Sequence, residues 1–224
     1  MSRRTALRSP SLLLAALVAA ATAAQAAPLT VSSYDTPNGD GQAHLGSYNY
    51  WDGTYDGHGN THRDGLSGGF LHGGTGALTD GVIATQAWNA VSDWSGTGEY
   101  VGWRASPTIT FHFADTVTIG SIKLYVDDSN IGGVTSPGAI TVDGTHYDNS
   151  DYPLYFGGPQ TITLDDLDIV GNTVKVTLDN PTSWVFLSEI QFFGPASTVP
   201  ESGNLAMMLA GLGLLGLASR RRRA

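Results

Sequence analysis

The segment from residue 27 to residue 200 consists of short alternating apolar and polar runs, separated by clusters of glycine, aspartate, asparagine and proline. The clearest run is 108–113, where Ile109, Phe111 and Phe113 fall on one face and threonine or histidine on the other. A period of two is that of a half-buried β-strand. No stretch of useful length repeats apolar residues at the helical period of about 3.6. The segment is therefore predicted to be all-β, as a sandwich or a barrel.

Seven runs are expected to form strands, and in chain order they are residues 29–34, 108–113, 117–126, 139–142, 161–164, 174–178 and 184–193. In the last run, a strict alternation places Trp184, Phe186, Ile190 and Phe192 on one face, and Val185, Leu187 and Glu189 on the other. Residues 38–81 are rich in glycine, aspartate, histidine and tyrosine, and we expect them to form long loops.

The charge of this segment limits its partners. Between residues 27 and 200 there are four basic residues against nineteen acidic ones, which gives a formal charge of −15. Such a surface repels phosphate backbones and anionic lipid, so nucleic acid is excluded as a partner. The chain has no cysteine, so its stability cannot come from disulfides. Divalent cations and neutral ligands are the partners that this charge favours.

The first 26 residues have the layout of a cleavable signal peptide. Arg3, Arg4 and Arg8 precede an apolar run at 12–24, and Ala24-Gln25-Ala26 offers a small-residue cleavage site. A first transmembrane helix is the alternative, but it needs about 20 apolar residues, and this run is shorter. Residues 1–26 are therefore predicted to direct export and to be removed.

The C-terminus combines an apolar run with a basic cluster. Residues 205–218 are mainly apolar, and Arg220, Arg221, Arg222 and Arg223 follow. This order is a stop-transfer pattern that leaves the arginines in the cytoplasm and the rest of the chain across the membrane. As a helix the run reaches about 21 Å, less than the hydrocarbon core of about 30 Å. Short apolar tails of this kind are often temporary anchors, so we expect an apolar helix that holds the chain briefly at a membrane.

The same end of the chain resembles the PEP-CTERM sorting signal of Gram-negative bacteria, in which a Pro-Glu-Pro-like motif, a short apolar helix and terminal arginines are recognised by an exosortase. Val199, Pro200 and Glu201 match this motif, and Ser202 replaces the second proline. The resemblance implies an exosortase-like processing enzyme as a partner. It also implies transient anchoring in the inner membrane with the body in the periplasm, followed by release to the cell surface or the extracellular space. An ordinary C-terminal membrane anchor is the alternative.

A second resemblance begins at Asp80-Gly81. With Thr85 and Trp88, this run resembles the Asp-Gly-x-x-x-Thr-x-Trp signature of discoidin-type domains, although Trp88 sits one residue later than in that pattern. These domains are galactose-binding-like jelly rolls and include many carbohydrate-binding modules. The resemblance implies a single jelly-roll β-sandwich over residues 27–194. A linker at residues 195–198 then leads to the sorting signal at 199–224.

The late match to the same family is Ser188-Glu189-Ile190, in the run expected to form the final strand. Metal-binding members hold a structural calcium ion with the motif's aspartate and threonine, nearby carbonyls and a late glutamate. The resemblance therefore implies calcium as a cofactor, held by Asp80, Thr85 and Glu189.

The residue types support calcium independently of the family. Calcium takes six to eight oxygen ligands, and an Asp-Gly turn offers a carboxylate and carbonyls in one tight loop. Glu189 alternates with apolar neighbours and has no basic residue near it in the sequence, and burying an unpaired carboxylate is costly. The alternative is that Asp80-Gly81 is only a turn and Glu189 only a charge at a strand edge.

Aromatic residues in the expected loops are candidates for ligand contact. Their flat apolar faces suit sugar rings when a polar donor lies nearby. A role in the core is the competing interpretation, and we assign that role to Trp88 and Trp103. The candidate ligand contacts are Trp94, Tyr100, Arg104 and Tyr152.

No set of residues in the sequence suggests catalysis. Residues 65–69 match Gly-x-Ser-x-Gly, but the apolar strand and the helix that a nucleophile elbow requires are missing. The sequence therefore predicts an exported, exosortase-sorted surface or extracellular-matrix protein that is not an enzyme. Its sandwich is predicted to bind glycan or exopolysaccharide, a link that the PEP-CTERM resemblance implies. The alternative is a structural biofilm-matrix or surface-coat protein with no specific small ligand.

Overall fold

The computed structural model describes residues 26–41, 49–61, 69–91, 98–152 and 157–196. All of them lie in one compact unit, Ala26–Ala196. Residues 1–25 of the expected signal peptide, the sorting signal at 199–224 and Trp94 lie outside the described residues. Among the helices in the described ranges, none has the length and apolar character that crossing a membrane requires.

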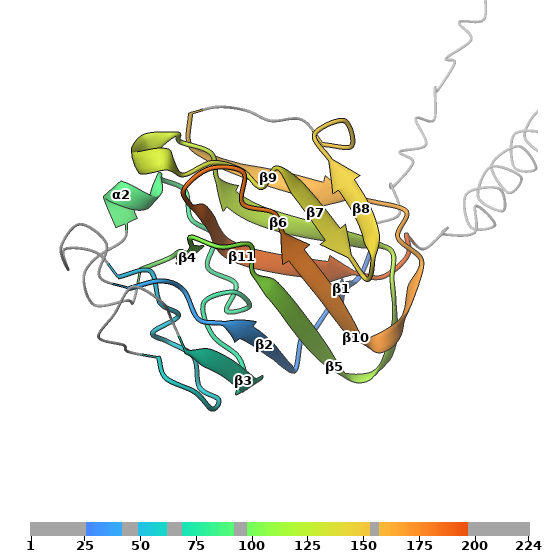
Figure 1. The fold of residues 1–224 in the computed structure, drawn as a ribbon. Helices are drawn as coiled ribbons and strands as arrows, with labels where there is room; N and C mark the ends of the chain where they lie inside the picture. The colour runs from blue at the N-terminus through green and yellow to red at the C-terminus, as the bar shows by residue number, and fades with distance from the viewer. Residues whose placement is uncertain (1–25, 42–48, 62–68, 92–97, 153–156, 197–224) are drawn as a thin grey trace, which may run out of the picture. The chain divides into compact units, whose positions relative to one another are not determined.

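The predicted all-β sandwich is confirmed (Figure 1), and its neighbouring strands all run antiparallel. The first sheet has the order β1 (Pro28–Leu29), β11 (Val185–Phe193), β6 (Ser121–Asp127) and β9 (Pro159–Leu164), and β4 (Val101–Trp103) also pairs with β11. The second sheet has the order β3 (Phe70–Gly74), β2 (Ser33–Pro37), β5 (Thr108–Ile119), β10 (Ile169–Leu178), β7 (Ala139–Val142) and β8 (Thr145–Asp148). The described ranges also contain α2 (Trp88–Val91) and the short 3₁₀ turn η1 (Ile131–Gly133).

The main core lies between the two sheets. Ile109, Phe111 and Phe113 of β5 are buried on the face that their alternation predicted. From the opposite sheet, the ring of Phe192 packs 5.0 Å from Phe111 and 5.4 Å from Phe113, centre to centre, in edge-on contacts. Burying each side chain of this size stabilises the fold by about 1.5–3 kcal/mol. The core therefore fixes the position of β11 against the second sheet.

A second, aromatic cluster packs around Phe186. The rings of Tyr50, Trp88 and Trp184 lie 4.7, 5.7 and 5.7 Å from that of Phe186, and Tyr100 joins the same cluster. Trp88 is 4% exposed and Trp103, in the main core, is 3% exposed. Both tryptophans are therefore core residues, as the sequence predicted.

The run expected to form one strand over residues 117–126 is two strands. β5 ends at Ile119 and β6 begins at Ser121. Between them, the N–H of Gly120 donates to the carbonyl of Phe193 at 2.8 Å, and its carbonyl accepts from the N–H of Leu167 at 3.0 Å. The chain therefore leaves one sheet at Gly120 and enters the other. The sequence carries a trace of this crossing, because the apolar alternation changes phase between Ile119 and Ile122.

The expectation of long loops over residues 38–81 is wrong in part, because this stretch contributes a strand and core side chains. β3 lies within it, and Tyr50 and Tyr55 are buried. The carboxylate of Asp52, fully buried, accepts hydrogen bonds from Tyr34 and from the backbone N–H of Ala77. Residues 49–52 are buried one after another rather than in alternation, so the pattern on which strand prediction rests is missing here.

The alternation predicted for the last strand is also wrong, because β11 contains a β-bulge. Leu187 pairs with Val126 and Glu189 pairs with Tyr125, which leaves Ser188 as an extra residue. A bulge reverses the phase of the strand. As a result, Leu187 before the bulge and Ile190 after it both join the main core. Glu189 is turned to the other face of the sheet.

We predict that Gly102→Ala destabilises the protein. Gly102 pairs with Phe186 across β4 and β11, and a Cβ at residue 102 would overlap the Phe186 ring. Overpacking of this kind typically costs about 1–3 kcal/mol. Gly171→Ala is the control, because a Cβ there meets no atom closer than 3.4 Å. Urea unfolding measures both, and equal stability of the two variants would contradict the packing described here.

Candidate functional site

The loop from residue 78 to residue 88 lies along β11. At its start, the carbonyl of Leu78 accepts the N–H of Ile190 at 2.9 Å. In its middle, the N–H of Ala84 donates to Oγ of Ser188 at 3.3 Å. Ser188 is the extra residue of the bulge, so its side chain can bond to the loop rather than enter the core. The bulge and the loop are thus held together by backbone and side-chain hydrogen bonds.

The end of the loop is fixed by Trp88, the first residue of α2. Its backbone N–H donates to the buried carboxylate of Asp127 at 2.5 Å. Its indole N–H donates to the carbonyl of Ile131 at 3.0 Å, and its ring packs in the aromatic cluster. Both ends of the loop are therefore held by buried groups, which leaves residues 80–83 as an exposed arch.

Glu189 lies beneath this arch and is 3% exposed. One of its carboxylate oxygens accepts the N–H of Gly81 at 3.2 Å. Burial raises the pKa of Glu189 to about 7, and the charge of Asp80 raises it further, while hydrogen bonds from Gly81 and Gln191 oppose the shift. Among the described residues, no lysine, arginine or histidine forms an ion pair with it. Two carboxylates therefore approach each other with no positive charge from this part of the chain.

The structure brings Asp80 and Glu189 together, although 108 residues separate Gly81 from Glu189. Asp80 is exposed, and its Oδ1 accepts the N–H of Val82 at 2.8 Å, which closes the turn. Thr85 is exposed on the same loop, next to Ala84. Asp80 and Glu189 thus share one junction between the loop and the strand, and Thr85 lies five residues further along the same loop.

The residues present at this junction fit a calcium ion. The ion needs oxygen donors, and the loop and β11 offer two carboxylates, the hydroxyl of Thr85 and the carbonyls of a tight turn. The described part of the chain contains no group of three or more acidic or histidine side chains placed for a metal. A calcium ion here would therefore take most of its ligands from carbonyls, the hydroxyl and water. The buried, unneutralised carboxylate of Glu189 is the feature that a cation would satisfy.

A groove of about 260 Å³ opens beside the loop, on the outer side of β6 and β9. Its polar groups include the side chains of Thr85, Tyr125, Gln160 and Thr161. The phenol of Tyr125 donates to Oε1 of Gln191 at 3.0 Å, so this ring is held in place. The groove therefore lies between the loop and a fixed, partly exposed aromatic ring. The rest of its wall is formed by Ile83, Ala84, Val126 and Pro159.

The residues predicted to contact a ligand do not form one surface. Tyr100 is 1% exposed and donates its hydroxyl to the carbonyl of Gln86, and Tyr152 is 2% exposed and donates to the carbonyl of Pro137. Both rings are packed in hydrophobic clusters and offer no face to a ligand. Arg104 is exposed, and its guanidinium lies 5.7 Å from the ring centre of Trp184.

Tyr125 and Gln191, the side chains that link the groove to Glu189, were not predicted from the sequence as site residues. A signal for Tyr125 was present, because Ile122, Leu124 and Val126 alternate with it and are buried. A period of two then places Tyr125 on the outer face. Gln191 could not be assigned in this way, because the bulge changes the phase of its strand.

The family of the chain follows from comparison with known proteins. A family model described as "Discoidin domain-containing receptor 1/2, DS-like domain" matches residues 30–194. This match covers most of the chain, and the chain belongs to that family. The discoidin resemblance read from Asp80-Gly81 and Glu189 is thereby confirmed. Among curated proteins, none matches the chain.

Several solved structures are similar over part of the chain. The crystal structure of SpGH29 has a TM-score of 0.34 at 15% identity, and the match covers 54% of this chain and 24% of that one. The chain therefore spans about a quarter of the length of SpGH29. The lectin domain of lectinolysin complexed with Lewis B antigen has a TM-score of 0.37 at 16% identity, covering 54% and 83%. A Streptococcus pneumoniae fucose binding module has a TM-score of 0.33 at 16% identity, covering 65% and 96%.

The raised pKa of Glu189 gives a testable dependence of stability on pH. In the unfolded chain this group titrates near 4.5, and in the folded metal-free protein near 7. The unfolded state therefore loses its proton first, and the free energy of unfolding should fall by roughly 3 kcal/mol as the pH rises across this window. Calcium should reduce this fall, because it stabilises the ionised carboxylate.

The measurement is urea unfolding from pH 4 to pH 8, in EDTA and in calcium. Other buried carboxylates also contribute to the dependence of stability on pH, so the wild type is compared with Glu189→Gln. This variant should lose the part of the fall in unfolding free energy that Glu189 causes, and also the response to calcium. Glu99→Gln is a matched control that should keep both. A Glu189→Gln profile parallel to that of the wild type would show that the two carboxylates do not interact as described.

Proposed function

We propose that this chain is a non-catalytic binding module in which calcium at Asp80, Thr85 and Glu189 fixes the loop over β11, and in which the adjacent groove binds a glycan. The observation that supports this most is the buried carboxylate of Glu189, which faces Asp80 with no cationic partner among the described residues. A bound cation would supply the missing positive charge. Glu189 and Asp80 would contribute carboxylate oxygens and Thr85 its hydroxyl.

The chemistry of the groove suits one sugar unit. Tyr125 offers part of an aromatic face, on which the C–H face of a sugar ring can pack. Thr85, Gln160 and Thr161 supply hydroxyl and amide groups that can bond sugar hydroxyls. The volume of about 260 Å³ is just below the range of roughly 300–1,000 Å³ typical of drug-sized ligands, as expected for a small ring. The acidic body favours a neutral glycan over an anionic one.

The groove is coupled to the calcium junction through side chains. Tyr125 bonds to Gln191, and Gln191 bonds to Glu189. Thr85 belongs both to the predicted calcium ligands and to the groove wall. Calcium would therefore order one side of the groove, and glycan affinity should depend on calcium.

We predict that Tyr125→Ala weakens glycan binding. An aromatic stacking contact typically contributes about 0.5–1.5 kcal/mol beyond the buried area. We therefore expect the affinity to fall by up to roughly ten-fold. A glycan array identifies a binding glycan, and titration calorimetry with that glycan measures the affinity. Tyr125→Phe tests the ring separately from the hydroxyl and should keep most of the binding.

Arg104→Ala is the matched surface control, because Arg104 lies against Trp184 rather than in the groove. It should bind as the wild type does. If Arg104→Ala lost binding while Tyr125→Ala kept it, the ligand site would lie at Trp184 instead. If no glycan or polysaccharide bound at all, the structural matrix or surface-coat alternative would replace the glycan proposal.

We further propose that the module is exported and sorted by its two ends. Residues 1–26 would direct export, and the signal at 199–224 would hold the chain briefly in the inner membrane with its body in the periplasm. An exosortase-like enzyme would recognise Val199, Pro200 and Glu201, together with the cluster of Arg220, Arg221, Arg222 and Arg223. The apolar helix and the arginines would then be removed, leaving the module at the cell surface or in the matrix.

This processing is tested by intact-mass measurement of protein extracted from the cell surface. We expect an N-terminus at Ala27 and a mass that lacks residues 205–224. A variant with alanine at residues 200 and 201 should keep its tail and stay with the inner membrane. A surface protein with the complete tail would support the ordinary membrane anchor instead.

A further inference from the structure

Two exposed histidines lie opposite each other at the edge of the second sheet, His72 in β3 and His58 in an isolated β-bridge to it. His58 and His72 exchange both backbone hydrogen bonds, N–H to carbonyl, at 2.9 Å in each direction. In an antiparallel ladder this exchange marks a directly opposed pair, whose side chains project on the same side of the sheet. We call these residues the His58–His72 pair.

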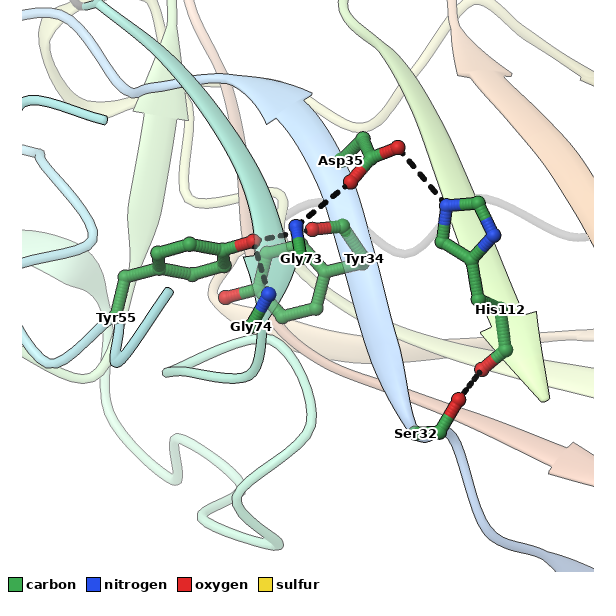
Figure 2. A network of polar contacts seen from close by, with 7 residues as sticks. All are labelled: Ser32, Tyr34, Asp35, Tyr55, Gly73, Gly74 and His112. Carbon is green, nitrogen blue, oxygen red and sulfur yellow. Dashed lines mark hydrogen bonds and ion pairs between the residues drawn. The ribbon is translucent and has the colours of Figure 1, made fainter. Parts of the chain in front are cut away.

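The backbone around the pair is held closely. A Cβ on Gly57 would overlap the backbone of Gly74, and one on Gly74 would overlap Gly57, so the two segments approach as only glycines allow. The phenol of Tyr55 also accepts the N–H of Gly74 at 2.8 Å, a contact visible in Figure 2. The histidines therefore project from two segments whose spacing is fixed.

The spacing of the rings matches two ligands of one metal ion. The centres of the His58 and His72 rings lie 5.2 Å apart, with their planes inclined by 32°. A Zn–N bond is about 2.0–2.1 Å, so two imidazoles at a tetrahedral angle place their ring centres roughly 5 Å apart. Because both side chains are exposed, rotation about their χ angles can turn a nitrogen of each toward a shared ion.

The surroundings favour a cation. A Cβ on Gly73 would lie 3.9 Å from Cδ2 of His58, so the glycine leaves open space beside this ring. The N–H of Gly73 donates to Asp35 at 2.9 Å, and the other oxygen of Asp35 lies 2.9 Å from His112, as Figure 2 shows. Asp56 precedes His58 by two residues and accepts the N–H of Thr75 at 2.6 Å. Asp56, two residues before His58, and Asp35, which bonds to the residue after His72, thus add negative charge near the pair.

From this geometry we infer that the His58–His72 pair binds a divalent transition-metal ion, with water completing its coordination. Imidazole nitrogens suit zinc, copper and nickel, whereas calcium takes oxygen ligands, so this site is chemically distinct from the junction at Asp80 and Glu189. The bound ion would link the segment around residue 58 to β3, the edge strand. It would therefore stabilise this edge of the sheet.

The test is a titration of the purified protein with ZnCl₂ in buffer that contains excess calcium, so that oxygen-rich sites are already occupied. Wild-type protein should bind zinc, and His58→Asn and His72→Asn should each weaken the affinity at least about ten-fold, because a two-histidine site loses half its protein ligands. His146→Asn, in β8 at the opposite edge of the sheet, should bind as the wild type does. Zinc should also raise the thermal midpoint of the wild type more than that of either variant.

Histidine ring NMR of the wild type provides a readout that does not depend on the variants. The ring signals of His58 and His72 should shift together on zinc addition, while that of His146 stays in place. Unchanged zinc affinity in both variants, shifts confined to other histidines, or no zinc binding would each overturn the inference.

Discussion

One carboxylate determines the arrangement of the candidate site. Glu189 is on the last strand of the sandwich, where the loop from residue 78 to residue 88 covers it. A buried carboxylate must either take up a proton or find positive charge. The pKa of Glu189, about 7, reflects the tendency of the buried carboxylate to take up a proton. Because Asp80 adds a second negative charge nearby, a bound cation would stabilise the ionised form instead. The proposed dependence on calcium follows from this local imbalance of charge.

The β-bulge at Ser188 is what makes this arrangement possible. Without the extra residue, the strand could not place Leu187 and Ile190 in the core and also turn Glu189 toward the loop. Bulges are over-represented next to functional sites, where they redirect a side chain. Ser188 itself is used twice, since its hydroxyl accepts from Ala84 and donates to the carbonyl of Tyr125. The junction is therefore built into the sheet and does not depend on the exposed loop alone.

The sequence predicted the parts of the fold that rest on regular alternation. The alternation predicted the β5 core face and the all-β class, because burial on one face of a strand leaves a period of two. The core role of Trp88 and Trp103 was predicted instead from the usual burial of large aromatic residues. Resemblance to the discoidin signature brought Asp80 and Glu189 together before the structure did. What could not be read were features with no periodic trace. These are the bulge at Ser188 and the burial of Tyr50, Tyr100 and Tyr152.

We propose that the Asp80–Glu189 junction holds calcium, and a crystal structure can show the ion itself. Crystals grown in calcium should show an anomalous difference peak between the two carboxylates, within the roughly 2.3–2.6 Å of each ligand oxygen that calcium requires. We expect this peak to disappear in Glu189→Gln crystals grown in the same way. A wild-type map without the peak, in which Glu189 contacts only Gly81 and Gln191, would contradict it.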